Sequence, residues 1–200
     1  SSMVRNVLTR EFSKDERLQV VGAAEDAYRA RDMIVELSPD VITLDLEMPR
    51  MNGLEFISVL MQHWPLPIVV FSSVVEERRD MGLKALELGA LEVFAKPRFD
   101  DPNGMKSVIS RLIETVVRAA QVDVKAHRPG WSHVVQSEKV RPTVSSMTSN
   151  KIIAIGASTG GTEALRAVLT PLPVSIPGIV IVQHMPEHFT RSFAERLNQL

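Results

Sequence analysis

The sequence predicts an α/β protein whose strands form doubly wound parallel sheets. Short apolar runs alternate with segments of helical periodicity through residues 1–120. The run over 67–71 is continuously apolar, as expected for a parallel strand that helices cover on both faces. Proline and glycine stand at several of the boundaries. These three observations favour a parallel sheet over a helical bundle or an antiparallel fold.

The elements of residues 1–120 are expected in a regular order. Pro39 should end one helix, and Gly89 suits the position just after another. The predicted helices cover residues 2–12, 28–37, 54–64, 78–88 and 105–120, and the predicted strands cover residues 18–22, 41–46, 67–71 and 91–95. The resulting helix–strand alternation calls for an open sheet with helices on its faces.

Three polar residues are expected at the carboxyl ends of strands in this region. Asp45 ends one strand, Ser72 follows the next, and Lys96 follows the last. Function gathers at this edge of parallel sheets. The carboxylate suits a nucleophile or metal ligand, and the ammonium and hydroxyl suit contacts to a phosphoryl group. The alternative is an Asp–Lys ion pair on the rim, with Ser72 capping a loop.

A second candidate site follows the apolar run that begins at Lys151. That run, which we expect to be buried, ends in Gly156-Ala-Ser-Thr-Gly-Gly161, and a helix follows at once. Such a turn exposes Ser158 as a nucleophile and offers the N–H of Thr159 to an oxyanion. Another apolar run ends at His184, one βαβ unit later, so Ser158 and His184 should be neighbours.

Other interpretations of this turn stay open. A glycine-rich turn before a helix also binds phosphate, and a serine there is often only an N-cap. A nucleotide site at Gly156–Gly161 is disfavoured because no acidic residue ends the next strand. His184 could be structural. His188, which we expect in a surface loop, competes as the base.

Composition narrows the class of protein further. The chain has 200 residues, 44% of them hydrophobic, which suits one or two globular domains. A net charge of −1 implies no general attraction to nucleic acid or to an anionic membrane. Without cysteine there is no disulfide or thiolate chemistry. No apolar run approaches the ~20 residues of a membrane span, and the amino-terminus lacks a signal peptide's apolar region.

The chain is expected to divide into two domains joined by a connector. Residues 121–150 lack helix or strand periodicity and contain Pro129, Gly130, Pro142 and a polar run, so they suit a flexible linker. Trp131 within them would pack on a neighbouring domain or contact a partner. The predicted domains are therefore residues 1–120 and 151–200.

Two groups of motifs resemble known families. Asp45-Leu-Glu-Met-Pro-Arg-Met-Asn-Gly53, Ser72 and Lys96-Pro97 resemble the receiver domain of two-component response regulators. Gly156-Ala-Ser-Thr-Gly-Gly161 and Gln183-His-Met-Pro186 resemble the catalytic domain of chemotaxis protein-glutamate methylesterases. A receiver followed by this domain looks like the CheB family. The resemblance implies a flavodoxin-like receiver followed by the start of a Rossmann-like methylesterase domain.

The resemblance also implies residue roles. Asp45 would accept the phosphoryl group, Ser72 and Lys96 would contact it, and Asp45 with the backbone carbonyl of Glu47 would help hold Mg²⁺. Ser158 would be the nucleophile, His184 its base and Thr159 an oxyanion donor. The reaction would be cytoplasmic hydrolysis of glutamyl methyl esters on chemoreceptors, with possible glutamine deamidation and no cofactor. A chemotaxis histidine kinase would supply the phosphoryl group, and phosphorylation would relieve the receiver's cover over the esterase site.

The chain departs from the family pattern at both ends. Neither the receiver's first strand with its acidic metal-binding pair nor the aspartate that orients the histidine falls within residues 1–200, and Asp123 is a poor substitute. Val93 stands where many receivers have an aromatic residue. We therefore expect a fragment that is inactive as an esterase by itself. The alternative function is a non-catalytic phospho-receiver module that acts by binding.

Overall fold

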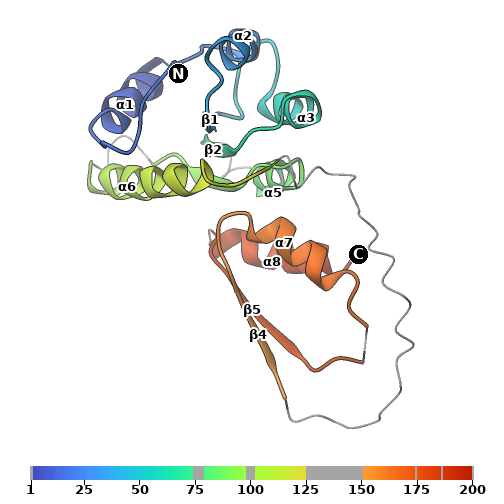
Figure 1. Ribbon diagram of the computed structural model, residues 1–200. Coiled ribbons are helices and arrows are strands. Elements are labelled where there is room, and N and C mark those ends of the chain that lie inside the picture. The colour runs from blue at the N-terminus through green and yellow to red at the C-terminus, as the bar shows by residue number, and fades with distance from the viewer. Residues whose placement is uncertain are drawn as a thin grey trace. The chain divides into compact units, whose positions relative to one another are not determined.

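The computed structural model describes residues 2–73, 79–97, 102–124, 151–173, 175–185 and 187–199 (Figure 1). The chain divides into two compact units, Ser1–Arg128 and Pro129–Leu200. Most of the expected linker, with Trp131, lies outside the described residues, and the domain boundaries remain predictions. No described helix combines the length and apolar character needed to cross a membrane.

The first unit contains a parallel sheet with the order β1-β2-β3. The strands are β1 (Ile42–Leu44), β2 (Ile68–Ser72) and β3 (Glu92–Ala95). The helices are α1 (Ser2–Phe12), α2 (Ala27–Leu37), α3 (Gly53–His63), α5 (Arg79–Glu87) and α6 (Pro102–Ala119). From α2 onward these elements confirm the predicted alternation, and they confirm the flavodoxin-like class, with boundaries that shift by at most three residues.

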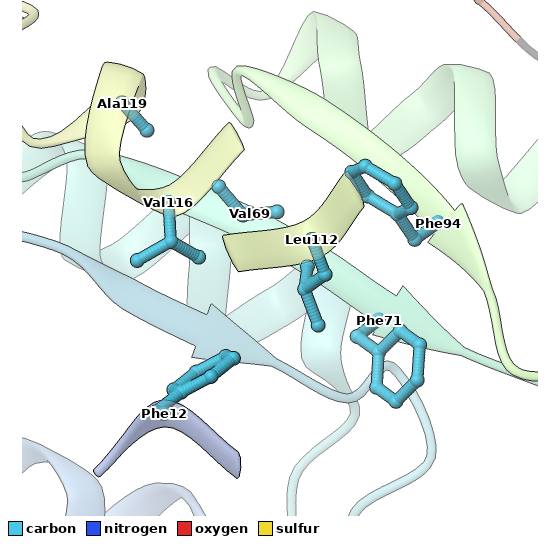
Figure 2. Close-up of a cluster of buried hydrophobic side chains, with 7 residues drawn as sticks. All are labelled: Phe12, Val69, Phe71, Phe94, Leu112, Val116 and Ala119. Atoms are coloured by element: carbon cyan, nitrogen blue, oxygen red, sulfur yellow. The ribbon is translucent and has the colours of Figure 1, made fainter. Parts of the chain in front are cut away.

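Strand β2 is the central strand, and its five residues are all buried. Val69 and Phe71 join a cluster with Phe94 of β3, Phe12 of α1 and three residues of α6, namely Leu112, Val116 and Ala119 (Figure 2). Ile68 and Val70 are equally buried and alternate to the opposite face of the strand. The continuous apolar run therefore reflects burial on both faces, as predicted.

One predicted strand is absent. Residues 18–22 are described but form no strand. They line a cavity of about 290 Å³ together with Ile42, Thr43 and Leu44 of β1. The apolar pattern was correct, since Leu18 and Val20 pack against the core cluster. The strand prediction was wrong because these residues pair with no described strand that would complete their backbone hydrogen bonds.

Helix α2 begins at an N-cap residue, Asp26. The buried carboxylate of Asp26 accepts from the Arg29 N–H at 2.9 Å and caps α2. Asp26 also forms an ion pair with Arg50, whose guanidinium lies 5.2 Å from the centre of the Tyr28 ring. These contacts connect α2 to the loop between β1 and α3.

The second unit is a βαβα arrangement with two parallel strands. Strands β4 (Ile153–Ala157) and β5 (Ile179–Gln183) are paired, and α7 (Gly161–Leu169) and α8 (Glu187–Leu197) follow them (Figure 1). Leu165 and Phe189 are buried, whereas Val180 and Val182 are 55% and 71% exposed. The expected burial of the run that begins at Lys151 was wrong: Ile152 is 73% exposed and Ile153 is 38% exposed, because the described residues leave these positions uncovered.

Candidate phosphoryl-acceptor and nucleophile sites

The candidate phosphoryl site lies at the carboxyl ends of the three strands of the first unit. Asp45 comes directly after β1, Ser72 ends β2, and Lys96 comes directly after β3. The parallel register pairs Leu44 with Val70 and Ser72 with Ala95, so these ends share one edge of the sheet. The sequence-based prediction of their common location agrees with this topology.

The carboxylate and the ammonium group at this edge form an ion pair. Lys96 Nζ donates to Asp45 Oδ2, and the two side chains are 11% and 22% exposed. The Ser72 side chain is fully buried, and its Oγ has no hydrogen-bond partner among the described residues. An unpaired buried hydroxyl is unusual, and it argues against the alternative in which Ser72 only caps a loop.

The loop after β1 folds back on the carboxylate. The Glu47 N–H donates to Asp45 Oδ1 at 3.2 Å, and the Ser73 hydroxyl donates to Glu47 Oε2 at 2.8 Å. A Cβ on Gly53 would stand 2.8 Å from the Asp45 carbonyl oxygen. The absence of a side chain at Gly53 therefore lets the start of α3 lie against the acceptor residue.

Among the described residues, Asp45 is the carboxylate at this edge that could bind a metal ion. No cluster of three or more histidine, cysteine, aspartate or glutamate side chains suited to a metal occurs in the part of the chain that the structure describes. Mg²⁺ commonly binds through one or two carboxylates together with water and phosphate oxygens. Asp45, with the Glu47 backbone beside it, fits that mode as a single carboxylate ligand.

The candidate nucleophile site lies at the ends of β4 and β5. The register pairs Ala157 with Gln183, and the His184 N–H donates to the Ala157 carbonyl at 2.9 Å. Ser158 and His184 therefore follow paired strand positions. Ser158 Oγ lies 3.5 Å from His184 Nδ1, within the looser range seen for such pairs without substrate.

The turn that carries Ser158 is closed by backbone hydrogen bonds. The Gly161 N–H donates to the Ser158 carbonyl at 2.7 Å, and Gly160 adopts φ 74° at the start of α7. Thr159 lies between Ser158 and Gly160, directly before the N-cap of α7. This strand–turn–helix geometry is the one that the G-x-S-x-G pattern predicted.

One prediction around this site changes. His188 lies in the first turn of α8 and not in a loop, because the helix already begins at Glu187, where an acidic residue is favoured. Asp123 belongs to the first unit, and residues 129–200 contain no aspartate.

The sequence interpretation quoted Gln183 in a motif but gave it no role. Its Nε2 donates to the carbonyl oxygens of both Ser158 and His184, each at 3.0 Å. A polar residue at the last position of an apolar strand, directly before a candidate base, was the available signal.

Comparison with known proteins identifies the family that each part of the chain resembles. Residues 1–125 match the response regulator receiver domain, and residues 153–200 match the CheB methylesterase domain. The chain therefore belongs to the response regulator receiver family, and the second match places it among the CheB-type members of that family.

Individual relatives support this assignment. Proteins named protein-glutamate methylesterase/protein-glutamine glutaminase are 44% identical in Syntrophotalea carbinolica and 48% identical in Syntrophus aciditrophicus, over 100% of this chain. The chain spans 57% of the length of each. The response regulator domain of Thermotoga maritima CheB is 34% identical with a TM-score of 0.56, over 62% of this chain and 92% of that one.

Proposed function

We propose that this chain serves in a phosphorylation-regulated protein-glutamate methylesterase that acts on chemoreceptors. The observation that carries the proposal is the approach of Ser158 Oγ to His184 Nδ1 at 3.5 Å, on a strand–turn–helix apex. The names of the relatives support the same reaction and suggest glutamine deamidation as a second activity.

The esterase chemistry follows from the two side chains. Ser158 Oγ attacks the carbonyl carbon of a glutamyl methyl ester while His184 accepts the hydroxyl proton. In the Nε2–H tautomer, Nδ1 carries the lone pair that takes this proton. The N–H of Thr159 stabilises the oxyanion. His184 then protonates the departing methoxide, and water hydrolyses the acyl-enzyme to regenerate Ser158 and a glutamate side chain.

Control is assigned to the first unit. Asp45 accepts a phosphoryl group, and Lys96 and Ser72 hydrogen-bond its oxygens. The Asp45–Lys96 ion pair and the Ser72 hydroxyl, which has no partner among the described residues, support these roles. Receiver domains generally bind Mg²⁺ for phosphorylation, and here Asp45 and the Glu47 backbone carbonyl would hold it. When bound there, Mg²⁺ would supply neutralisation of the charge on the transferring phosphoryl group.

The expected partners follow from the family. A chemotaxis histidine kinase supplies the phosphoryl group, methyl-accepting chemoreceptors are the substrate, and the reaction takes place in the cytoplasm. The relatives' names and the receiver match support this assignment.

Ser158→Ala tests the esterase, measured as methanol release from methylated receptor by the protein that carries this sequence. Loss of the nucleophile should lower turnover about 10⁶-fold, as in other serine hydrolases. Ser175→Ala, an exposed serine of the same unit, is the matched control and should leave the rate unchanged. Activity of Ser158→Ala within tenfold of the parent would reject Ser158 as the nucleophile.

A second candidate function is a phospho-receiver module that acts by binding. It is favoured by one observation: Asp45 and Lys96 are already in contact at the acceptor edge, as a phospho-receiver needs with or without an esterase. Labelling of Ser158 by a phosphonyl fluoride separates the two functions, because a binding module has no activated serine.

A further inference from the structure

Gln183 lies where a polar side chain is least expected. It is the last residue of β5, and it follows Ile179 and Ile181 on the covered face of the strand, while Val180 and Val182 face outward. A polar side chain on such a face needs hydrogen-bond partners to offset its desolvation. Its contacts therefore indicate what it does.

Both donors of the Gln183 amide are used. Nε2 donates to the carbonyl oxygen of Ser158 and to that of His184, each at 3.0 Å. Since both neighbours are acceptors, only the NH₂ group can face them, and this chemistry determines the orientation of the amide. One side chain thus joins the backbone of the nucleophile to the backbone of the base.

The amide oxygen faces the start of α7. Gln183 Oε1 is buried without a hydrogen-bond partner among the described residues. A Cβ on Gly161, the first residue of α7, would stand 2.2 Å from this oxygen and 2.8 Å from Ala157 Cβ. Only glycine at position 161 lets the amide sit here. The positive end of the α7 dipole favours an oxygen at this place.

The Ser158 carbonyl is held from two directions. It accepts from the Gly161 N–H at 2.7 Å and from Gln183 Nε2 at 3.0 Å. The turn that carries the Ser158 hydroxyl is therefore tied both to α7 and to the end of β5. Without the hydrogen bond from Gln183, the Ser158 turn would be held only by the hydrogen bond from the Gly161 N–H and by the pairing of β4 with β5.

We propose that Gln183 is a positioning residue of the esterase, which maintains the Ser158–His184 approach by clamping both backbones. This inference rests on the proposed function of Ser158 and His184. Gln183 touches no reacting atom; it acts through the two residues that do. Displacement of such a pair by about 1 Å is enough to lower turnover on the order of 10²-fold.

The test compares Gln183→Met with Gln183→Glu. Methionine keeps the length and packing of the side chain but removes both donors, and glutamate places a carboxylate against two carbonyl oxygens. Gln199→Met, an exposed glutamine of the same unit, is the matched control. The number of active sites is titrated with a phosphonyl fluoride, which releases fluoride when it reacts with Ser158. The esterase kcat per titrated site should fall about 10²-fold in both variants, with KM nearly unchanged.

A purely structural role predicts a different result. Destabilised variants would show fewer titratable sites and a lower unfolding temperature, but each remaining site would turn over at the parental rate. A kcat per titrated site within twofold of the parent would therefore overturn the proposal. Gly161→Ala provides the second variant: it should lower kcat by displacing the amide, and its effect should not add to that of Gln183→Met.

Failure of the clamp is distinguishable from failure of the esterase assignment. If the parent itself does not react at Ser158, the proposed function fails, and NMR still tests the clamp. The side-chain NH₂ protons of Gln183 should exchange slowly with solvent, and Gly161→Ala should speed that exchange. Unprotected signals in the parent would show that the clamp is absent.

Discussion

Lys96 and Asp45 form an ion pair at one edge of the receiver sheet, although 51 positions separate them in the chain. Each comes directly after a strand, and β2 lies between those two strands. Both side chains are partly shielded from water, which strengthens their attraction relative to an exposed pair. The pair places a cation beside the carboxylate that we propose as the phosphoryl acceptor.

Asp45→Asn should abolish phosphorylation of the chain by a small phosphodonor in the presence of Mg²⁺, because the amide offers no anionic oxygen to attack phosphorus. Mass spectrometry of the intact protein, or a phosphate-sensitive gel, measures the modified fraction. Asp40→Asn, an exposed aspartate just before β1, serves as the control and should be modified as the parent is. Equal modification of Asp45→Asn and the parent would rule out Asp45 as the acceptor.

Asp26→Ala should destabilise the first unit. Its carboxylate caps α2 and pairs with Arg50, and loss of an N-cap alone costs about 0.5–2 kcal/mol. Asp26→Asn keeps the cap and removes the charge, so it should retain more stability than Asp26→Ala. Urea unfolding measures both, with Asp32→Ala on the exposed face of α2 as the control. Identical midpoints for Asp26→Ala and Asp32→Ala would contradict the cap.

Leu112→Ala should cost about 2–5 kcal/mol of unfolding free energy, because it opens a cavity in a closely packed core. Leu112 is a residue of α6, and it is fully buried in the cluster of Figure 2 together with Val69 and Phe71 of β2. Val35→Ala, at a position 55% exposed on α2, should change stability by less than about 0.5 kcal/mol. A Leu112→Ala cost as small as that of Val35→Ala would show that α6 does not pack as described.

Stability should fall as the solution is acidified, through the contacts of Arg17. The Arg17 side chain holds the pKa of Asp15 at about 2, below its ordinary 3.8, and lowers the pKa of Glu114 as well. A carboxylate with a lowered folded-state pKa stabilises the fold above its unfolded-state pKa. That contribution should disappear between about pH 4 and pH 2.

Arg17→Met isolates this effect. The variant should be less stable than the parent at neutral pH, and the difference should shrink as the pH falls toward 2, where Asp15 becomes protonated. Chemical unfolding across that pH range provides the measurement. Arg29→Met, at an exposed arginine of α2 that forms no ion pair among the described residues, should show no such pH dependence relative to the parent. A parent–variant difference independent of pH would refute the linkage.

Local sequence patterns were sufficient for most elements. Helix α1 has the predicted bounds, and the continuous run at 67–71 became the fully buried β2. These predictions succeeded because side-chain periodicity and burial are tied to the geometry of each element. The sequence also allowed Asp45, Ser72 and Lys96 to be assigned to one edge, because neighbouring parallel strands end at the same edge of a sheet.

Pairing and side-chain contacts were decided only by the tertiary structure. Residues 18–22 carry a strand's apolar pattern, but strand formation also needs a hydrogen-bonding neighbour, which local sequence does not supply. Gln183 shows the same limit at the site. Its identity is plain in the sequence, yet its hydrogen bonds to Ser158 and His184 depend on the β4–β5 register and on the missing side chain of Gly161. The sequence determined which groups are available, and packing determined which of them meet, because contacts between distant segments depend on the whole arrangement of backbone and side chains.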